Sequence, residues 1–173
     1  MKEQELLAQA LELGFANAGL IDTGDLIFVP AFRPLCQENL CGKYGVNYAC
    51  PPDCGTVEEM RQSVLRWPRA LVMQTMWDIE DPMDEAQTKP AKGRHNKLTR
   101  QLIDRAGAPG LMIGASGCSL CTPCALAEGL PCRFPALLLH VRLLHLCQGA
   151  GRALRHGVRL RSRGRGVFQH VLL

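Results

Sequence analysis

A helix followed by a buried strand is predicted for residues 56–76, which read TVEEMRQSVLRWPRALVMQTM. Thr56 followed by Glu59 is a capping-box signature for a helix start. An apolar helical face follows, made of Val57, Met60, Val64 and Leu65. We expect this helix to end near Trp67, because Pro68 follows it. Residues 70–76 are a short apolar run, whose length is typical of a buried strand.

Helices and strands alternate along the rest of the chain. An opening amphipathic helix is expected to end at residues 19–20, and a strand is expected at residues 26–29. Residues 78–90 are acidic and loop-like, residues 93–106 are predicted to be helical, and residues 110–115 are predicted to form a further strand. The alternation predicts an α/β fold, with a small mixed sheet, packed helices and two cysteine-rich loops at strand ends.

Nine cysteines in 173 residues are more than an ordinary globular protein contains. The density is below that of small secreted domains, and a chain of this length can bury a core without disulfides. The N-terminal residues MKEQE lack the basic start and apolar run of a signal peptide, and no apolar run reaches the roughly 18 residues that span a bilayer. We therefore expect a cytoplasmic protein with reduced thiols and no membrane contact.

Four cysteines lie close together in the second half of the chain: Cys118, Cys121, Cys124 and Cys132. The first three have the spacing C-x2-C-x2-C, which lets a tight loop place three thiolates on one face of an iron-sulfur cubane. Zinc usually takes its ligands from two separated C-x2-C pairs, so the spacing favours a [4Fe-4S] cluster. A zinc site and redox or structural thiols stay open as alternatives. The proline that follows the fourth cysteine in bacterial ferredoxins is missing here.

An earlier group consists of Cys36, Cys41, Cys50 and Cys54, with four, eight and three residues between them. Nearby glycines permit close approach of the backbone to an inorganic core, and nearby prolines stiffen the loop. The spacing matches no single metal motif. A second metal site therefore stays open, as does a cysteine that exchanges between the two sites, so the prediction is one cluster or two.

His95 is the only histidine before residue 136, and basic residues surround it. We favour a position on a solvated helix face over a role as a ligand or in proton transfer. Tyr44, Trp67 and Trp77 could shield a cluster from solvent, but aromatic residues are more often part of the core. We assign these three residues no role.

The two cysteine groups share a detailed pattern with their neighbours. The pattern is Cys36-x4-Cys41-Gly42-x-Tyr44-Gly45-x4-Cys50-Pro51-Pro52-x-Cys54-Gly55, then Gly117-Cys118-x2-Cys121-x2-Cys124 and Pro131-Cys132-Arg133-Phe134-Pro135. In this pattern, and in its Arg94-His95 pair, the chain resembles the CGCGC family of bacterial and archaeal predicted metal-binding proteins. The resemblance covers residues 1–135. It implies metal binding by these cysteines and no established reaction.

The resemblance stops after residue 135, which divides the chain into a cysteine-rich metal-binding domain (1–135) and an arginine-rich tail (136–173). The tail holds seven arginines and no acidic residue, so it is the source of the chain's net charge of +4. We hypothesise a reading-frame shift near residues 138–140, which would leave Cys147 and the tail histidines without an evolved role. Without a shift, residues 155–165 form a basic arm. That arm lacks aromatic residues for base stacking, so a nucleic-acid partner is not expected.

The leading function is therefore that of an iron-sulfur protein that transfers single electrons to a redox protein partner, with cysteine thiolates as ligands. The alternatives are a zinc-stabilised structural or interaction module and a cluster-dependent enzyme of unknown substrate. The sequence contains no Ser/His/Asp arrangement, phosphate-binding loop or dinucleotide fingerprint that would indicate a substrate.

Overall fold

The structure is a computed structural model, which describes residues 3–81, 84–107, 110–114, 118, 120–134, 139–140 and 165–172. Its longer elements are α1 (Glu3–Leu13), β1 (Asn17–Asp22), α2 (Arg33–Gln37), α3 (Val57–Leu65), β2 (Arg69–Asp78), α4 (Glu85–Ala106), β3 (Met112–Gly114), β4 (Leu139–His140) and β5 (Arg165–Leu172). Short 3-10 helices are η1 (Thr23–Asp25), η2 (Pro30–Phe32) and η3 (Ala125–Glu128). None of the helices described is both long and apolar enough to cross a membrane.

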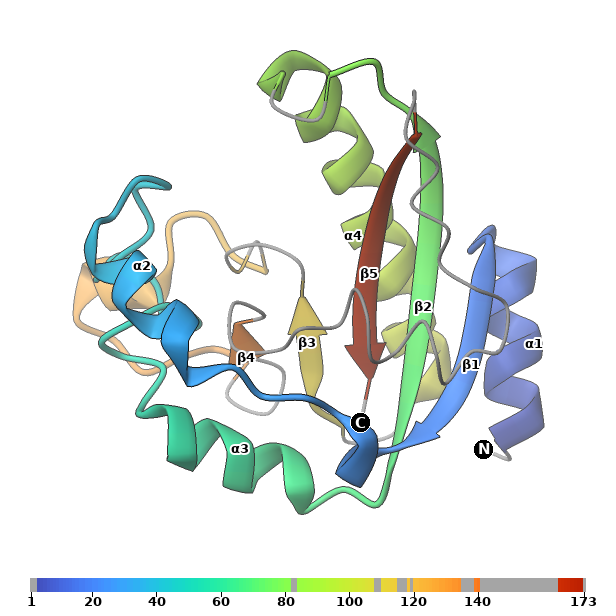
Figure 1. The fold of residues 1–173 in the computed structure, drawn as a ribbon, viewed down its shortest axis with the longest axis horizontal. Coiled ribbons are helices and arrows are strands. Elements are labelled where there is room, and N and C mark those ends of the chain that lie inside the picture. Colours follow the sequence, from blue (N-terminus) through green and yellow to red (C-terminus); the bar gives the residue numbers. More distant parts are fainter. Residues whose placement is uncertain are drawn as a thin grey trace.

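Five strands form one mixed sheet in the order β1-β2-β5-β3-β4 (Figure 1). β2 is antiparallel to both of its neighbours: Gly19 of β1 lies opposite Val72, and Thr75 lies opposite Phe168 of β5. β3 pairs antiparallel with β5 and parallel with β4. The predicted α/β class, with a small mixed sheet and packed helices, is confirmed.

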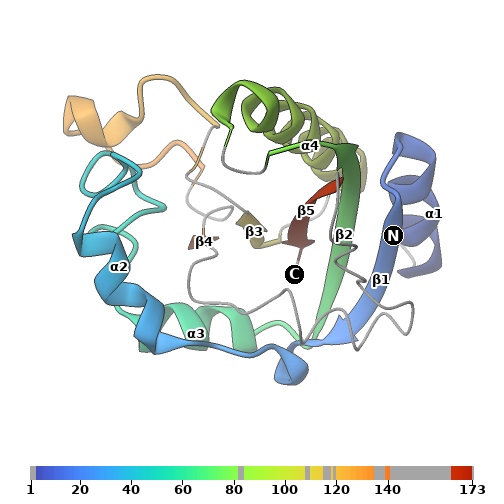
Figure 2. The ribbon, with the colours of Figure 1, turned by 45° about the horizontal axis from the view of Figure 1, so that its top comes forward.

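The strand β2 is covered on both faces, because residues 70–75 are all buried. Ala70 and Val72 pack in a cluster with residues of α3, whereas Leu71 and Met73 pack with residues of α1 and α4. Successive side chains of a strand point to opposite faces, so the two clusters lie on the two sides of the sheet. Figure 2 shows α3 and α4 on these opposite sides. Burial on both faces explains why residues 70–73 are all apolar.

Two predicted boundaries near the N-terminus are wrong. Helix α1 ends at Leu13 because Gly14 has a φ of 106°, which a residue without Cβ adopts at little cost. The amide of Phe15 then donates to the carbonyl of Ala10 at 3.2 Å and closes the helix end. Residues 19–20 therefore belong to β1. The strand predicted at residues 26–29 is reduced to an isolated bridge at Phe28.

The predictions for the central elements are confirmed, with one change. The capping box of α3 is formed: the Glu59 amide donates to Thr56 Oγ1 at 3.2 Å, and the Thr56 amide donates to Glu59 Oε2 at 2.7 Å. Helix α4 starts earlier than residue 93. Asp84 caps it by accepting a 2.8 Å hydrogen bond from the Ala86 amide, and Pro90 lies inside the helix.

Residues 136–173 are described only at β4 and β5. The backbone of β5 occupies the middle of the sheet, between β2 and β3. Cys147 and most of the predicted basic arm lie outside the described residues. The division at residue 135 and the reading-frame hypothesis therefore stay predictions.

Candidate metal centre

The two cysteine-bearing segments lie side by side at the β4 end of the sheet, away from α1 (Figures 1 and 2). The second segment follows β3, as predicted, whereas the first begins within α2 rather than at a strand end. Tyr48 Oη donates a 2.8 Å hydrogen bond to the backbone carbonyl of Leu130 and joins the segments. Two cysteine groups far apart in the sequence are thereby neighbours in the fold.

In the first group, the cysteines differ in exposure. Cys50 is buried, Cys41 is exposed, and Cys36 and Cys54 are half-buried. Backbone hydrogen bonds close the turn that holds the buried thiol: the Cys50 amide donates to the Asn47 carbonyl at 3.0 Å, and the Cys54 amide donates to the Cys50 carbonyl at 3.1 Å. This turn brings two ligand candidates together within one helical-type loop.

The thiols of the first group are close enough to affect one another electrostatically. Burial raises the pKa of the Cys50 thiol to about 11, the Asn47 side chain lowers it through a hydrogen bond, and the other three thiols of the group raise it further. Burial also raises the pKa of the Cys54 thiol, against which Arg33 acts. Because burial disfavours a thiolate here, a bound cation or cluster has to compensate for its charge.

Arg33 is the basic residue in contact with the first group. Its guanidinium donates to Cys54 Sγ at 3.3 Å and to the Gly55 carbonyl at 2.5 Å. A guanidinium stays charged at all ordinary pH values, so this contact favours the thiolate form of Cys54.

In the second group, all four cysteines are half-buried. Two sulfurs accept hydrogen bonds from backbone amides two residues further on: Leu120 donates to Cys118 at 3.5 Å, and Phe134 donates to Cys132 at 3.4 Å. Burial raises the pKa of the Cys118 thiol, the Leu120 amide lowers it, and the other three thiols of the group raise it. All four candidate ligands are therefore in one neighbourhood.

Among the described residues, no three histidine, cysteine or acidic side chains lie close enough together to hold a single metal ion. The mutual effects on the thiol pKa values do not contradict this, because electrostatic effects reach further than ligand bonds. The donor chemistry of each group fits a thiolate-bound centre. Four thiols are suitable ligands for zinc or for an iron-sulfur cluster, and hydrogen bonds to sulfur support both.

The prediction that His95 lies on a solvated helix face is wrong. Only 1% of the residue is exposed, and its Nδ1 lies 2.7 Å from Thr75 Oγ1 of β2. Trp77 Nε1 donates to the same hydroxyl at 2.9 Å, and the ring of Phe15 meets the imidazole edge to face. Burial lowers the pKa of His95 to about 4, so the ring is neutral at neutral pH.

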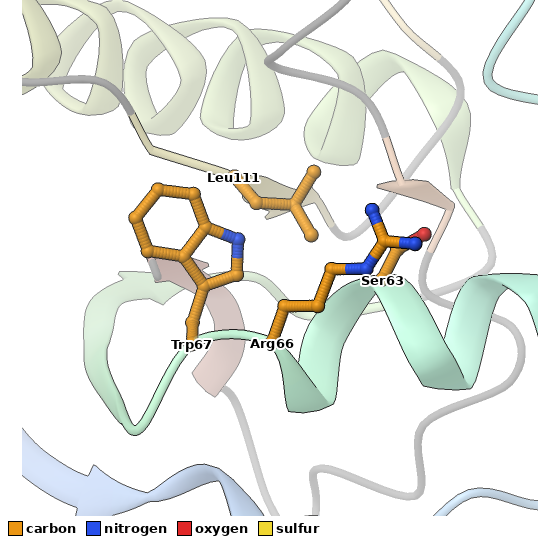
Figure 3. A pocket seen from close by; sticks show the side chains of 4 residues that line it. All are labelled: Ser63, Arg66, Trp67 and Leu111. Carbon is orange, nitrogen blue, oxygen red and sulfur yellow. The ribbon is translucent and has the colours of Figure 1, made fainter.

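A hollow of about 330 Å³ lies beside the end of α3 and is lined by Ser63, Arg66, Trp67 and Leu111. Figure 3 shows Arg66 and Trp67 extending from the end of α3 toward Leu111, which precedes β3. Trp67 also packs against the buried cluster on this side of the sheet, in agreement with a core role. None of the four lining residues is a cysteine, so the hollow is distinct from both cysteine groups.

Three further residues that contact the cysteine segments were not singled out from the sequence: Arg33, Tyr48 and Arg100. Arg33 and Tyr48 lie within a few positions of a cysteine, which is a weak indication by itself. Arg100 is on α4, and its guanidinium donates to the Leu120 carbonyl at 3.3 Å. No local sequence pattern connects a helical arginine to a loop 20 positions away.

A small mixed sheet that carries two neighbouring groups of four thiols defines a cysteine-rich α/β protein. The family model described as Predicted metal-binding protein (DUF2284) matches residues 19–141, and the chain belongs to this family. The match includes both cysteine groups, so the resemblance to a family of predicted metal-binding proteins is confirmed. No curated protein and no solved structure matches the chain.

Proposed function

We propose that Cys118, Cys121, Cys124 and Cys132 hold a [4Fe-4S] cluster, and that the protein transfers single electrons to a redox protein partner in the cytoplasm. A thiolate-bound centre at this group is supported by the pair of amide hydrogen bonds to Cys118 and Cys132. Hydrogen bonds to sulfur stabilise thiolate ligands and help to set a cluster's potential. The observation that carries the choice of an iron-sulfur cluster over zinc is the C-x2-C-x2-C spacing, because it is typical of clusters rather than of paired zinc knuckles.

The first group, Cys36, Cys41, Cys50 and Cys54, is proposed to hold a second metal centre. Support comes from the mutual influence of its four thiols and from the guanidinium of Arg33 at Cys54 Sγ. A bound cluster supplies one-electron chemistry. The chain's own residues bind it through sulfur, donate hydrogen bonds to that sulfur, and limit the access of water to buried ligands such as Cys50.

The test is anaerobic purification followed by iron, zinc and sulfide analysis. An absorption spectrum is recorded at about 400 nm, the region in which iron-sulfur charge transfer absorbs. We expect about four irons and four sulfides per chain for the cluster at the second group, and more if the first group also holds one. Cys121→Ser removes the iron of the second group. Cys147→Ser is the matched control, since Cys147 is outside both groups in the sequence.

Two outcomes separate the candidate functions. Stoichiometric zinc in a colourless protein would rule out electron transfer and support a zinc-stabilised interaction module. An unchanged metal content in Cys41→Ser would reject only the proposed centre at the first group, because Cys41 belongs only to that group.

A further inference from the structure

Arg100 contacts the second cysteine segment at two places that are far apart in the sequence. Its guanidinium donates to the Leu120 carbonyl at 3.3 Å, and it lies over the ring of Phe134 with 5.4 Å between the guanidinium carbon and the ring centroid. The second distance is within the range of a cation–π contact. One side chain therefore holds both ends of the segment that carries the second group.

Within the part of the chain that the structure describes, the two residues that Arg100 contacts here are also the two whose amides donate to cysteine sulfur. Leu120 donates to Cys118, and Phe134 donates to Cys132. Arg100 holds the Leu120 carbonyl, which belongs to the peptide group directly after the one whose N–H donates to Cys118, and it contacts Phe134 through the ring. These contacts restrain the directions in which the two N–H groups point.

Helix α4, which carries Arg100, is anchored in the protein core next to this residue. The two neighbours of Arg100 on the buried side of the helix, Thr99 and Leu102, are fully buried, and Leu102 belongs to the core cluster with β2. Arg100 itself is half-buried. A side chain anchored in this way can impose a geometry on a loop that has little regular structure of its own.

We infer that Arg100 is a positioning residue for the metal centre of the second group: it restrains Leu120 and Phe134, whose amides hydrogen-bond Cys118 and Cys132, and its permanent positive charge offsets part of the thiolate charge. This inference rests on the proposed metal centre at the second group. It does not depend on whether the metal is iron or zinc, because both require oriented thiolates.

The test compares Arg100→Gln with wild type and with Arg105→Gln in the purified full-length protein. Arg105 is the matched control, since it lies on the same helix and pairs with Glu12 at 3.6 Å instead of with a cysteine segment. The first readout is the rate at which the second group's metal, whether iron or zinc, is lost to a chelator. We expect Arg100→Gln to lose it about tenfold faster, at the low end of the effect of removing a ligand's own hydrogen-bond partner, because Arg100 acts through Leu120 and Phe134.

The second readout is the midpoint potential, where the metal is an iron-sulfur cluster. Removal of a positive charge disfavours the reduced cluster, so Arg100→Gln should shift the potential to more negative values. Arg100→Lys keeps the charge and loses the planar contact, so its potential should stay near that of wild type while its metal is lost faster. Arg105→Gln should change neither quantity.

Phe134→Leu is the second variant, in case Arg100→Gln does not fold. It removes the ring under Arg100 and should also accelerate metal loss. Wild-type rates in both Arg100→Gln and Phe134→Leu would overturn the inference, as would an equal acceleration in Arg105→Gln. Zinc in place of iron would contradict the proposed electron transfer while the release rates still test Arg100.

Discussion

The hydroxyl of Tyr48 donates a 2.8 Å hydrogen bond to the backbone carbonyl of Leu130, across 82 positions of the sequence. Tyr48 lies two residues before Cys50, and Leu130 lies two residues before Cys132. The bond therefore joins the two cysteine segments close to a ligand candidate of each. Movement of one segment is expected to affect the other, so the two groups form one structural unit.

Tyr48→Phe should loosen this connection without removing any ligand. We expect the free energy of unfolding to fall by about 1 kcal/mol, the usual net value of a hydrogen bond to a neutral partner, and metal release to become faster. Denaturant unfolding and chelator competition measure the two effects. Tyr44→Phe, the same change elsewhere in the first segment, is the control, and equal effects in both variants would contradict the role given to Tyr48.

Arg33→Gln should make the Cys54 thiol less reactive in the metal-free state. The guanidinium contact at 3.3 Å opposes the rise in pKa that burial causes, so its loss removes the main opposing influence and raises the pKa of the Cys54 thiol further. A higher pKa means that less of the thiol is ionised at neutral pH. The thiolate fraction falls about tenfold for each pKa unit. We expect slower alkylation of Cys54 by iodoacetamide, followed by mass spectrometry of the cysteine-containing peptides.

The control for Arg33 is Arg61→Gln. Arg61 lies on α3 and pairs with Glu58, and its removal leaves the contacts of Cys54 unchanged. Alkylation of Cys54 at the wild-type rate, or faster, in Arg33→Gln would show that the guanidinium does not stabilise the thiolate.

Buried His95 should make the protein less stable in mild acid. Its pKa falls from 6.5 to about 4 on folding, so between these values the unfolded chain binds a proton that the folded chain does not. This contribution to stability is complete above pH 6.5 and is lost as the pH falls to about 4. The loss is on the order of 3 kcal/mol, since each pKa unit corresponds to about 1.4 kcal/mol.

Two measurements check the histidine. An NMR titration of the His95 ring should give a pKa near 4, and a value near 6.5 would contradict the burial seen here. The free energy of unfolding is then measured by denaturant between pH 4 and pH 7. It should depend less on pH in His95→Gln than in wild type, because the two proteins have all other titrating groups in common.

Leu71→Ala tests whether β2 is covered on both faces. Leu71 is 1% exposed and belongs to the cluster with α1 and α4, so truncation should lower the free energy of unfolding by about 2–5 kcal/mol. Leu40→Ala is the control, since Leu40 is 86% exposed. Its effect should stay within about 0.5 kcal/mol. Equal effects of the two substitutions would contradict the arrangement of the sheet between its helices.

Local patterns in the sequence determined several elements. The Thr56–Glu59 capping box and the apolar face after it predicted α3, and the apolar run at residues 70–76 predicted β2. These predictions hold because their causes lie within one helical turn or one strand. The same reasoning placed the end of α1 too late, since the periodic apolar residues continue past Gly14 and only the backbone conformation there ends the helix.

The sequence by itself also determined which thiols are the ligand candidates, because C-x2-C-x2-C and its glycine and proline neighbours are chemical and local features. The tertiary structure decided which groups meet. It buried His95 against Thr75, joined Tyr48 to Leu130, and brought Arg100 to the second segment. The physical reason is that such contacts depend on how α4 and the loops pack around the sheet, and packing of this kind leaves no short-range pattern in the sequence.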